Sequence, residues 1–399
     1  MRLRNFMDEC YNCTMIIRNI FAEMVEVLDE FPVVALIGPR QCGKTTLARH
    51  AAEVRGLTSI YLDLELSSDL AKLKNAELFL KSHEDKLIII DEIHHAPNLF
   101  ALIRALVDQK RTNGRFLILG SASPSLLQQS AESLTGRIYY FELSPFSLRE
   151  IQEEKSMSDH WFRGGYPGSL LAGKPETSRR WLNSYIRNYT SRDLPDLGLK
   201  VSPLLIDRFW RILASYHGQI WNASRIASVM GLTANTINRY LFFLKEAFLV
   251  HELQPLEGNF LKRLVRSPKI YIRDSGILHQ LIHIQDFDSL HGDGRIGASW
   301  EGYVIEQIHL ALGQRCDLNY YRTHNGAECD LVLSSNGAPE IAIEIKYSLQ
   351  PAVSKGFFET ISDLQTKRNF VIVPTGDPYP IRDGVVVIGL KEFLGEIIG

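Results

Sequence analysis

The sequence predicts an α/β protein whose N-terminal part is a P-loop nucleotide-binding domain, and three observations indicate this fold class. A glycine-rich phosphate-loop pattern stands between an apolar β-branched run and a stretch without helix breakers. A second apolar run ends in two adjacent carboxylates, which is typical of a buried parallel strand beside a nucleotide. A third apolar run ends in Gly120 and Ser121.

The phosphate loop fits G-x-x-x-x-G-K-[ST] at every fixed position, with a strand expected before it and a helix after it. Glycines allow backbone N–H groups to surround phosphate oxygens, and a helix N-terminus adds partial positive charge. Lys44 is expected to reach the β- and γ-phosphates of ATP, and Thr45 to hold Mg²⁺. Lys44 and the helix N-terminus are also expected to favour the thiolate of Cys42 and so its reaction with thiol reagents; the alternative is a small filler side chain without a redox role. The residues expected to bind the nucleotide are Gly38, Pro39, Arg40, Gln41, Cys42, Gly43, Lys44, Thr45 and Thr46.

The acidic pair follows the apolar residues 87–90. Asp91 is expected to hold the Mg²⁺ of ATP, and Glu92 to polarise the water that attacks the γ-phosphate. A kinase that phosphorylates a metabolite uses a substrate hydroxyl as nucleophile and has less use for Glu92. The pair therefore favours ATP hydrolysis over the metabolite-kinase interpretation.

Two further catalytic residues follow from position in the chain. Ser121, just past the strand at 116–119, is expected to contact the γ-phosphate or the attacking water. Arg137 precedes the strand at 138–143 and is expected to neutralise charge on a γ-phosphate, usually that of a neighbouring subunit. The alternative for Arg137 is a surface ion pair with a carboxylate.

Together these residues resemble those of the AAA+ ATPases, and more narrowly a large prokaryotic AAA+ family of ATP-binding proteins. The resemblance covers essentially the whole chain. It implies a five-stranded parallel sheet in residues 1–150, a helical lid in residues 151–200 and a homo-oligomer, with a hexamer among the expected assemblies. The other stretches that carry it are Ile37-Gly38-Pro39-Arg40-Gln41, Leu119-Gly120-Ser121-Ala122, Leu143-Ser144-Pro145-Phe146 and Gly164-Gly165-Tyr166-Pro167.

Residues 201–290 resemble a winged helix-turn-helix. A short helix ends at Gly231, Thr233 caps a second helix, and a strand-like run follows. A local excess of basic residues comes next, and it includes Lys269 and Arg273. This module is expected to bind DNA, although winged helices also serve as protein-binding modules. The residues expected to contact DNA are Asn235, Thr236, Asn238, Arg239, Lys262, Arg263 and Arg266.

Residues 291–399 carry a second set of candidate catalytic residues. Glu301 is expected on a helix, Asp330 on a strand, and Glu344 with Lys346 on the next strand. Hairpin pairing is expected to bring these side chains together. The set resembles the PD-(D/E)XK phosphodiesterase fold, with Cys329 where the name has proline. Glu301, Asp330 and Glu344 are expected to hold a second Mg²⁺ or Mn²⁺, with Lys346 orienting water or stabilising the phosphate. The sequence leaves open whether this domain cleaves DNA.

Composition narrows the class of protein. The chain has 399 residues, a formal net charge of −2, 45% hydrophobic and 23% charged residues, which is ordinary for a soluble globular protein. No apolar run is long enough to span a membrane, and five scattered cysteines favour a cytoplasmic location.

The leading hypothesis is an oligomeric AAA+ ATPase that couples ATP hydrolysis to binding or remodelling of DNA. The alternative is an ATP-dependent switch or scaffold whose C-terminal domain binds DNA or a protein partner without cutting.

Overall fold

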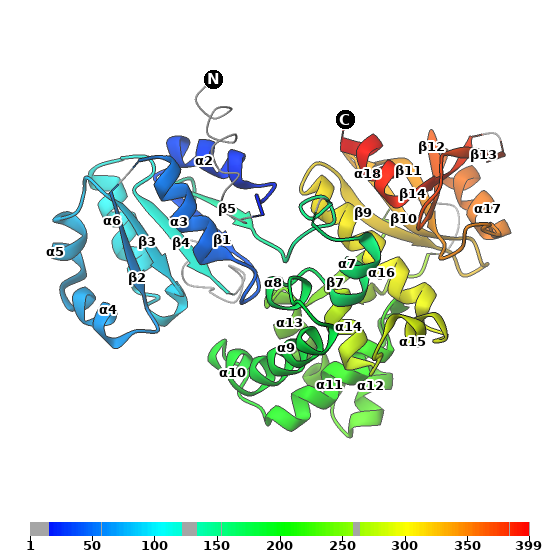
Figure 1. Ribbon diagram of the computed structural model, residues 1–399, viewed down its shortest axis with the longest axis horizontal. Coiled ribbons are helices and arrows are strands. Elements are labelled where there is room, and N and C mark those ends of the chain that lie inside the picture. The colour runs from blue at the N-terminus through cyan, green and yellow to red at the C-terminus, as the bar shows by residue number, and fades with distance from the viewer. Residues whose placement is uncertain are drawn as a thin grey trace. The chain divides into compact units, whose positions relative to one another are not determined.

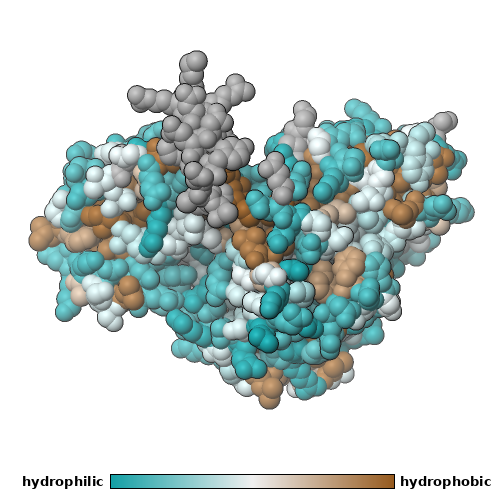
Figure 2. Space-filling view, in the orientation of Figure 1, coloured by the Kyte–Doolittle hydropathy of each residue, from teal (hydrophilic) through white to brown (hydrophobic). Residues whose placement is uncertain are grey.

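The structure is a computed structural model that describes residues 16–56, 58–121, 134–152, 154–257, 264–382 and 384–398. The chain divides into two compact units, Met1–Met157 (unit 1) and Ser158–Gly399 (unit 2). Both units combine strands and helices, so the predicted α/β class is confirmed (Figure 1). Hydrophilic residues cover most of the face drawn in Figure 2. No helix within the described ranges has the length and apolar character needed to cross a membrane.

Unit 1 contains a five-stranded parallel sheet in the order β2-β3-β4-β1-β5, and the predicted sheet is therefore confirmed. All neighbouring strands run in the same direction, so the carboxyl ends of β1, β3 and β4 meet at one edge. That edge carries the phosphate loop, the acidic pair and Ser121. The strands are β1 (Val33–Ile37), β2 (Ser59–Asp63), β3 (Leu87–Asp91), β4 (Phe116–Gly120) and β5 (Ile138–Glu142).

Helices cover both faces of this sheet, because its central strands are apolar on both sides. Helices α2 and α3 share one buried cluster with the strands, and α5 and α6 share the other. The helices of unit 1 are α2 (Phe21–Glu30), α3 (Lys44–Val54), α4 (Ser67–Lys72), α5 (Ala76–Lys81) and α6 (Leu99–Gln109), with single 3-10 turns at Leu73–Asn75 and Ile93–His95.

Unit 2 begins with helices that include the predicted lid segment and the predicted helix-turn-helix. Helix α12 ends at Gly231, whose φ of 68° is left-handed, and the Thr233 hydroxyl accepts a hydrogen bond from the Thr236 N–H at the start of α13. The helices are α7 (Met157–Arg163), α8 (Pro167–Leu170), α9 (Pro175–Asn188), α10 (Leu194–Asp196), α11 (Pro203–Ser215), α12 (Ala223–Met230), α13 (Ala234–Glu246), α14 (Ser275–Leu281) and α15 (Phe287–His291), with a π-helical turn at Tyr189–Asp193.

One nine-stranded mixed sheet runs through unit 2 in the order β13-β14-β12-β11-β10-β9-β7-β8-β6. Pairing of β7 with β9 joins the segment predicted to be a helix-turn-helix to the C-terminal segment, so both share one sheet. The strands are β6 (Gln219–Ile220), β7 (Val250–Pro255), β8 (Lys269–Ile272), β9 (Asp317–Arg322), β10 (Glu328–Ser335), β11 (Ala338–Ile345), β12 (Arg368–Val373), β13 (Tyr379–Arg382) and β14 (Val385–Gly389). The C-terminal helices are α16 (Ile296–Leu312), α17 (Lys355–Leu364) and α18 (Leu390–Ile398).

Two stretches that carry the family resemblance are places of close backbone approach. A Cβ atom on Gly38 would lie 2.1 Å from the Leu143 carbonyl oxygen, so the phosphate loop can pass this backbone only with glycine there. A Cβ atom on Gly164 would lie 2.1 Å from a carboxylate oxygen of Asp274. Asp274 in turn accepts a hydrogen bond from the Gly165 N–H at 2.8 Å. Close packing therefore explains why glycine stands at positions 38 and 164.

Candidate functional site

The phosphate loop holds Lys44 with its charge available for an anion. The Lys44 side chain is buried, and its amine donates to the carbonyl oxygens of Gly38 and Pro39 at 2.9 and 2.8 Å. These partners are neutral oxygens. Gly43 lies just before α3 with φ of 103°, so glycine suits the turn into this helix. A buried ammonium beside a helix N-terminus fits the phosphates of ATP.

Thr45 and Asp91 lie together at the same edge of the sheet. The Thr45 hydroxyl donates to Asp91 Oδ2 at 2.8 Å, and the Tyr61 hydroxyl donates to the same oxygen at 2.6 Å. A hydroxyl and a carboxylate in contact are the oxygen ligands that Mg²⁺ prefers. Both predicted Mg²⁺ ligands therefore fit the metal of a bound MgATP, and Tyr61 is an additional residue that orients Asp91.

Glu92 is the next residue, and its carboxylate is fixed by two neighbours. Ser121 is fully buried and donates its hydroxyl to Glu92 Oε2 at 2.8 Å, and His94 Nδ1 lies 3.1 Å from the same oxygen. Burial alone would raise the pKa of Glu92, but His94 and the charge of Lys44 outweigh it and lower this pKa to about 2. Glu92 is thus ionised at neutral pH. Ser121 contacts Glu92, so its role near the γ-phosphate would be to position that carboxylate.

Arg18 is a residue of this site that the sequence did not reveal. Its guanidinium is buried and donates to the Cys42 carbonyl oxygen in the phosphate loop at 2.9 Å and to the Ser144 carbonyl oxygen at 2.6 Å. Arg18 Nε also donates to Glu150 at 3.1 Å. The arginine therefore fastens the phosphate loop to the segment after β5. No local motif surrounds Arg18, so nothing in its sequence neighbourhood indicates this role.

The expectation of a reactive Cys42 is wrong. The Cys42 side chain is fully buried, and its thiol donates to the Leu143 carbonyl oxygen at 3.2 Å. Burial raises the pKa of the Cys42 thiol, and this effect exceeds the opposing charges of Lys44 and Arg18. The thiol is a packed part of the loop.

Arg137 lies at the opposite edge of the sheet from the phosphate loop of its own subunit. It immediately precedes β5, whose first residue, Ile138, pairs with Val33 at the start of β1. The five residues of β1 separate that edge from the phosphate loop by about 16 Å. Arg137 Nε contacts Asp108 Oδ1 at 2.6 Å in a partly exposed ion pair. This is the surface ion pair with a carboxylate that was the alternative for Arg137, and the residue lies far from the phosphate loop of its own chain.

The residues expected to contact DNA are partly exposed. On α13, Asn235, Asn238 and Arg239 are exposed and Thr236 is half-buried. Asn238 accepts a hydrogen bond from the Trp221 indole at 3.0 Å. Arg266 is exposed before β8, while Lys262 and Arg263 lie outside the described residues.

Lys269 and Arg273 belong to the interior, so the expectation that they extend an exposed basic surface is wrong. Along β8 and just past it, Lys269, Tyr271 and Arg273 point to one side because strand side chains alternate. All three meet carboxylates of α16. Tyr271 and Lys269 contact Glu301, and Arg273 contacts Glu306 at 2.8–2.9 Å.

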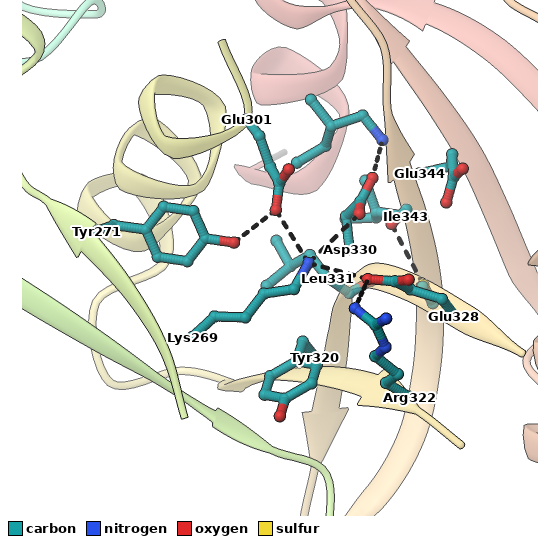
Figure 3. A network of polar contacts seen from close by, with 12 residues as sticks. Lys269, Tyr271, Glu301, Tyr320, Arg322, Glu328, Asp330, Leu331, Ile343 and Glu344 are labelled. Carbon is teal, nitrogen blue, oxygen red and sulfur yellow. Dashed lines mark hydrogen bonds and ion pairs between the residues drawn. The ribbon is translucent and has the colours of Figure 1, made fainter. Parts of the chain in front are cut away.

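Two of the acidic residues predicted in the C-terminal segment, Glu301 and Asp330, come together around Lys269 with Glu328, which the sequence analysis missed (Figure 3). The Lys269 amine lies 3.1 Å from Glu301 Oε1, 3.4 Å from Glu328 Oε1 and 3.7 Å from Asp330 Oδ1. Burial opposes its charge, but Glu301 and the two other carboxylates hold the pKa of Lys269 above its ordinary value. The cluster lines a pocket of about 530 Å³.

Glu344 and Lys346 form the other side of this pocket. The Lys346 amine lies 2.7 Å from Glu344 Oε1, and Asp330 accepts a hydrogen bond from the Ile345 N–H at 2.9 Å. Burial and the Asp330 carboxylate raise the pKa of Glu344 to about 7. Within the described ranges, no group of three or more His, Cys, Asp or Glu side chains is arranged to hold a metal ion. As arranged, the cluster does not fit the expected second Mg²⁺ or Mn²⁺, because an ammonium lies among its carboxylates.

Comparison with known protein families finds matches to three successive parts of the chain. An AAA domain model matches residues 30–152, and two domains of unknown function, DUF8612 and DUF4143, match residues 154–288 and 296–393. The uncharacterized proteins Rv2008c of Mycobacterium tuberculosis and Mb2031c of Mycobacterium bovis are each 39% identical over 378 residues, which is 94% of this chain and 84% of theirs.

Solved structures give more distant likenesses. The Walker-type ATPase PABY2304 of Pyrococcus abyssi is 17% identical with a TM-score of 0.45, over 67% of this chain and 96% of that one. The RuvB Holliday junction branch migration motor of Thermotoga maritima is 18% identical with a TM-score of 0.32, over 59% of this chain and 90% of that one.

Proposed function

Since the chain belongs to the family of the mycobacterial proteins Rv2008c and Mb2031c and contains an AAA domain, we propose that it couples ATP hydrolysis to the binding or remodelling of DNA. The observation that carries the hydrolytic part is the convergence of Lys44, Thr45, Asp91, Glu92 and Ser121 at the carboxyl edge of one sheet. This edge is where parallel α/β sheets bind their ligands.

Each residue has a separate role in hydrolysis. The Lys44 amine exchanges its carbonyl partners for the β- and γ-phosphates, and Thr45 with Asp91 holds the Mg²⁺ that neutralises phosphate charge. Glu92, ionised and held by Ser121, orients the attacking water. Arg18 keeps the phosphate loop in place.

We assign the γ-phosphate contact of Arg137 to a neighbouring subunit, so the active form is a homo-oligomer. The position of Arg137 at the far edge of its own sheet supports this assignment. Arg137→Ala subunits should bind ATP and hydrolyse it poorly. Mixing them with Lys44→Ala subunits should restore part of the activity, because some interfaces then combine an intact Lys44 with an intact Arg137. Arg104→Ala, an exposed arginine of α6, serves as control. Full activity of a dilute Arg137→Ala monomer would refute the shared site.

The DNA-binding part rests on unit 2. The order α11-β6-α12-α13-β7-β8 is that of a winged helix-turn-helix, in which α13 would enter a major groove and the β7–β8 connection would form the wing. The exposed Asn235, Asn238 and Arg239 on α13 support DNA as ligand, as does Arg266 in the wing. The C-terminal strands and α16 supply a nuclease-like domain beside this module, joined to it through β7 and β9.

DNA binding is tested by changing Lys262, Arg263 and Arg266 together to glutamate. The affinity for duplex DNA should fall, and the slope of log K against log salt should become shallower by about 0.9 for each phosphate that the variant no longer neutralises. Lys355→Glu, at a fully solvated position on α17, is the control and should keep the parental slope. An unchanged slope in the triple variant, or no binding by the parental protein, would favour the protein-switch alternative.

A further inference from the structure

The cluster of carboxylates in unit 2 already contains a cation. The Lys269 amine lies within 3.1–3.7 Å of oxygens from Glu301, Glu328 and Asp330, and its side chain is only 4% exposed. Three cationic residues and four acidic residues line the surrounding pocket, so its charge is nearly balanced. Lys346 faces Glu344, and Arg322 faces Glu328 at 3.3 Å.

The position of Lys269 is set by the sheet. In the sheet, Lys269 pairs with Leu253 on β7 and with Ile220 on β6, so its backbone is held from both sides. The amine lies 5.6 Å from the centre of the Tyr320 ring. Tyr271, two residues along β8, donates its hydroxyl to the same Glu301 carboxylate (Figure 3). The ammonium is therefore built into the site from two flanking strands and is not a mobile surface side chain.

A divalent cation would need the same oxygens. Mg²⁺ and Ca²⁺ require carboxylate oxygens at about 2.0–2.6 Å, and Glu301 with Asp330 are the carboxylates that flank the amine. A metal bound between them would lie next to a buried positive charge in a region of low dielectric, where like charges repel strongly. The Lys269 ammonium and a divalent metal ion between Glu301 and Asp330 therefore exclude each other.

We propose that Lys269 is the resident cation of this cluster and takes the place of a divalent metal there. The C-terminal domain then holds its ligand without metal-dependent hydrolysis, and Lys269 ties β8 to α16 and β10. This inference goes beyond the proposed coupling of ATP hydrolysis to DNA. Its test uses neither ATP nor DNA, so its failure leaves that coupling unaffected.

The test is Mn²⁺ binding, followed by the electron paramagnetic resonance signal of free Mn²⁺ during titration of the nucleotide-free, full-length protein. The parental protein and Asp330→Asn should bind the same amount of Mn²⁺, because the cluster takes none. Lys269→Ala should gain one Mn²⁺, since it frees the carboxylates and opens space between them. The gain should disappear in the double variant Lys269→Ala, Asp330→Asn.

Lys355→Ala is the matched control. It removes a lysine that lies 3.5 Å from the Glu359 carboxylate but is 91% exposed, and it should gain no Mn²⁺. Two results would overturn the proposal: a Mn²⁺ ion that the parental protein binds and Asp330→Asn loses, or a folded Lys269→Ala that binds no additional Mn²⁺. If Lys269→Ala does not fold, the comparison of the parental protein with Asp330→Asn still decides between a resident lysine and a metal.

Discussion

Two glycines of α16 should respond in opposite ways to the same substitution by alanine. A Cβ atom on Gly302 would lie 2.2 Å from His217 Nε2 and 2.7 Å from His217 Cε1. His217 cannot easily move away, because it is buried and its Nδ1 accepts the Ile272 N–H at 3.0 Å. Gly297, earlier on the same helix, is exposed and has no heavy atom of the described residues within 4 Å of such a Cβ. Gly302→Ala tests how closely α16 approaches His217 and β8.

The expected change in the free energy of unfolding is the balance of a stabilising effect of alanine in a helix and the destabilising effects of crowding. Alanine in place of a helical glycine stabilises by up to about 1 kcal/mol at either position. At Gly302 this gain is outweighed by overpacking, which costs about 1–3 kcal/mol, and by strain on the buried His217 hydrogen bond, worth about 1 kcal/mol. We expect Gly302→Ala to destabilise unit 2 by about 2 kcal/mol, which lowers its unfolding temperature by about 4–8 °C. Gly297→Ala should raise that temperature by about 1–3 °C.

Differential scanning calorimetry of the full chain measures both shifts in the transition that contains unit 2. ATP should not change the difference between the two variants, because both positions lie outside the AAA domain. Equal shifts of the same sign for Gly302→Ala and Gly297→Ala would refute the close packing of His217 against α16.

Three further predictions concern single residues. Glu92→Gln should keep ATP affinity while slowing hydrolysis by about 10²–10⁴-fold, measured by nucleotide titration and steady-state ATPase, and a parental rate would exclude Glu92 as the group that orients water. Arg18→Met should weaken ATP binding by about tenfold, since the phosphate loop loses its attachment to Ser144, and an unchanged dissociation constant would contradict that role. Burial raises the pKa of Asp274 from 3.8 to about 6, so the folded state keeps this proton to higher pH than the unfolded chain does. The resulting stability is present below about pH 4 and is lost as pH rises through about 6, and Asp274→Asn should flatten this dependence in urea titrations at about pH 4–7.

The convergence of the candidate nucleotide-site residues could be predicted because the sequence information that places them is local. Lys44, Thr45, Asp91 and Glu92 each sit in a short motif next to an apolar strand, and parallel strands bring their carboxyl ends together. Ser121 followed from the same rule. Its contact with Glu92 did not, because that contact depends on side-chain orientation.

The cluster in unit 2 could be predicted only in part. Asp330 and Glu344 are close in sequence, and the pairing of β10 with β11 brings them together as expected. Lys269 comes from a strand much earlier in the chain, and its place depends on the pairing of β8 with β7 and β6. In sequence it resembled one more exposed basic residue beside Arg266. Only the three-dimensional pairing separates a buried lysine from a solvated one.

The most direct test of the proposed function is the steady-state rate of ATP hydrolysis with and without DNA. The purified protein should be assayed alone and with duplex, single-stranded and branched DNA, with Glu92→Gln as the control for contaminating ATPases. We expect at least one of these DNA forms to increase the rate of the parental protein, and the Lys262, Arg263 and Arg266 triple glutamate variant to lose that increase. A rate that is the same with every DNA form, together with the absence of DNA binding, would contradict the coupling of ATP hydrolysis to DNA.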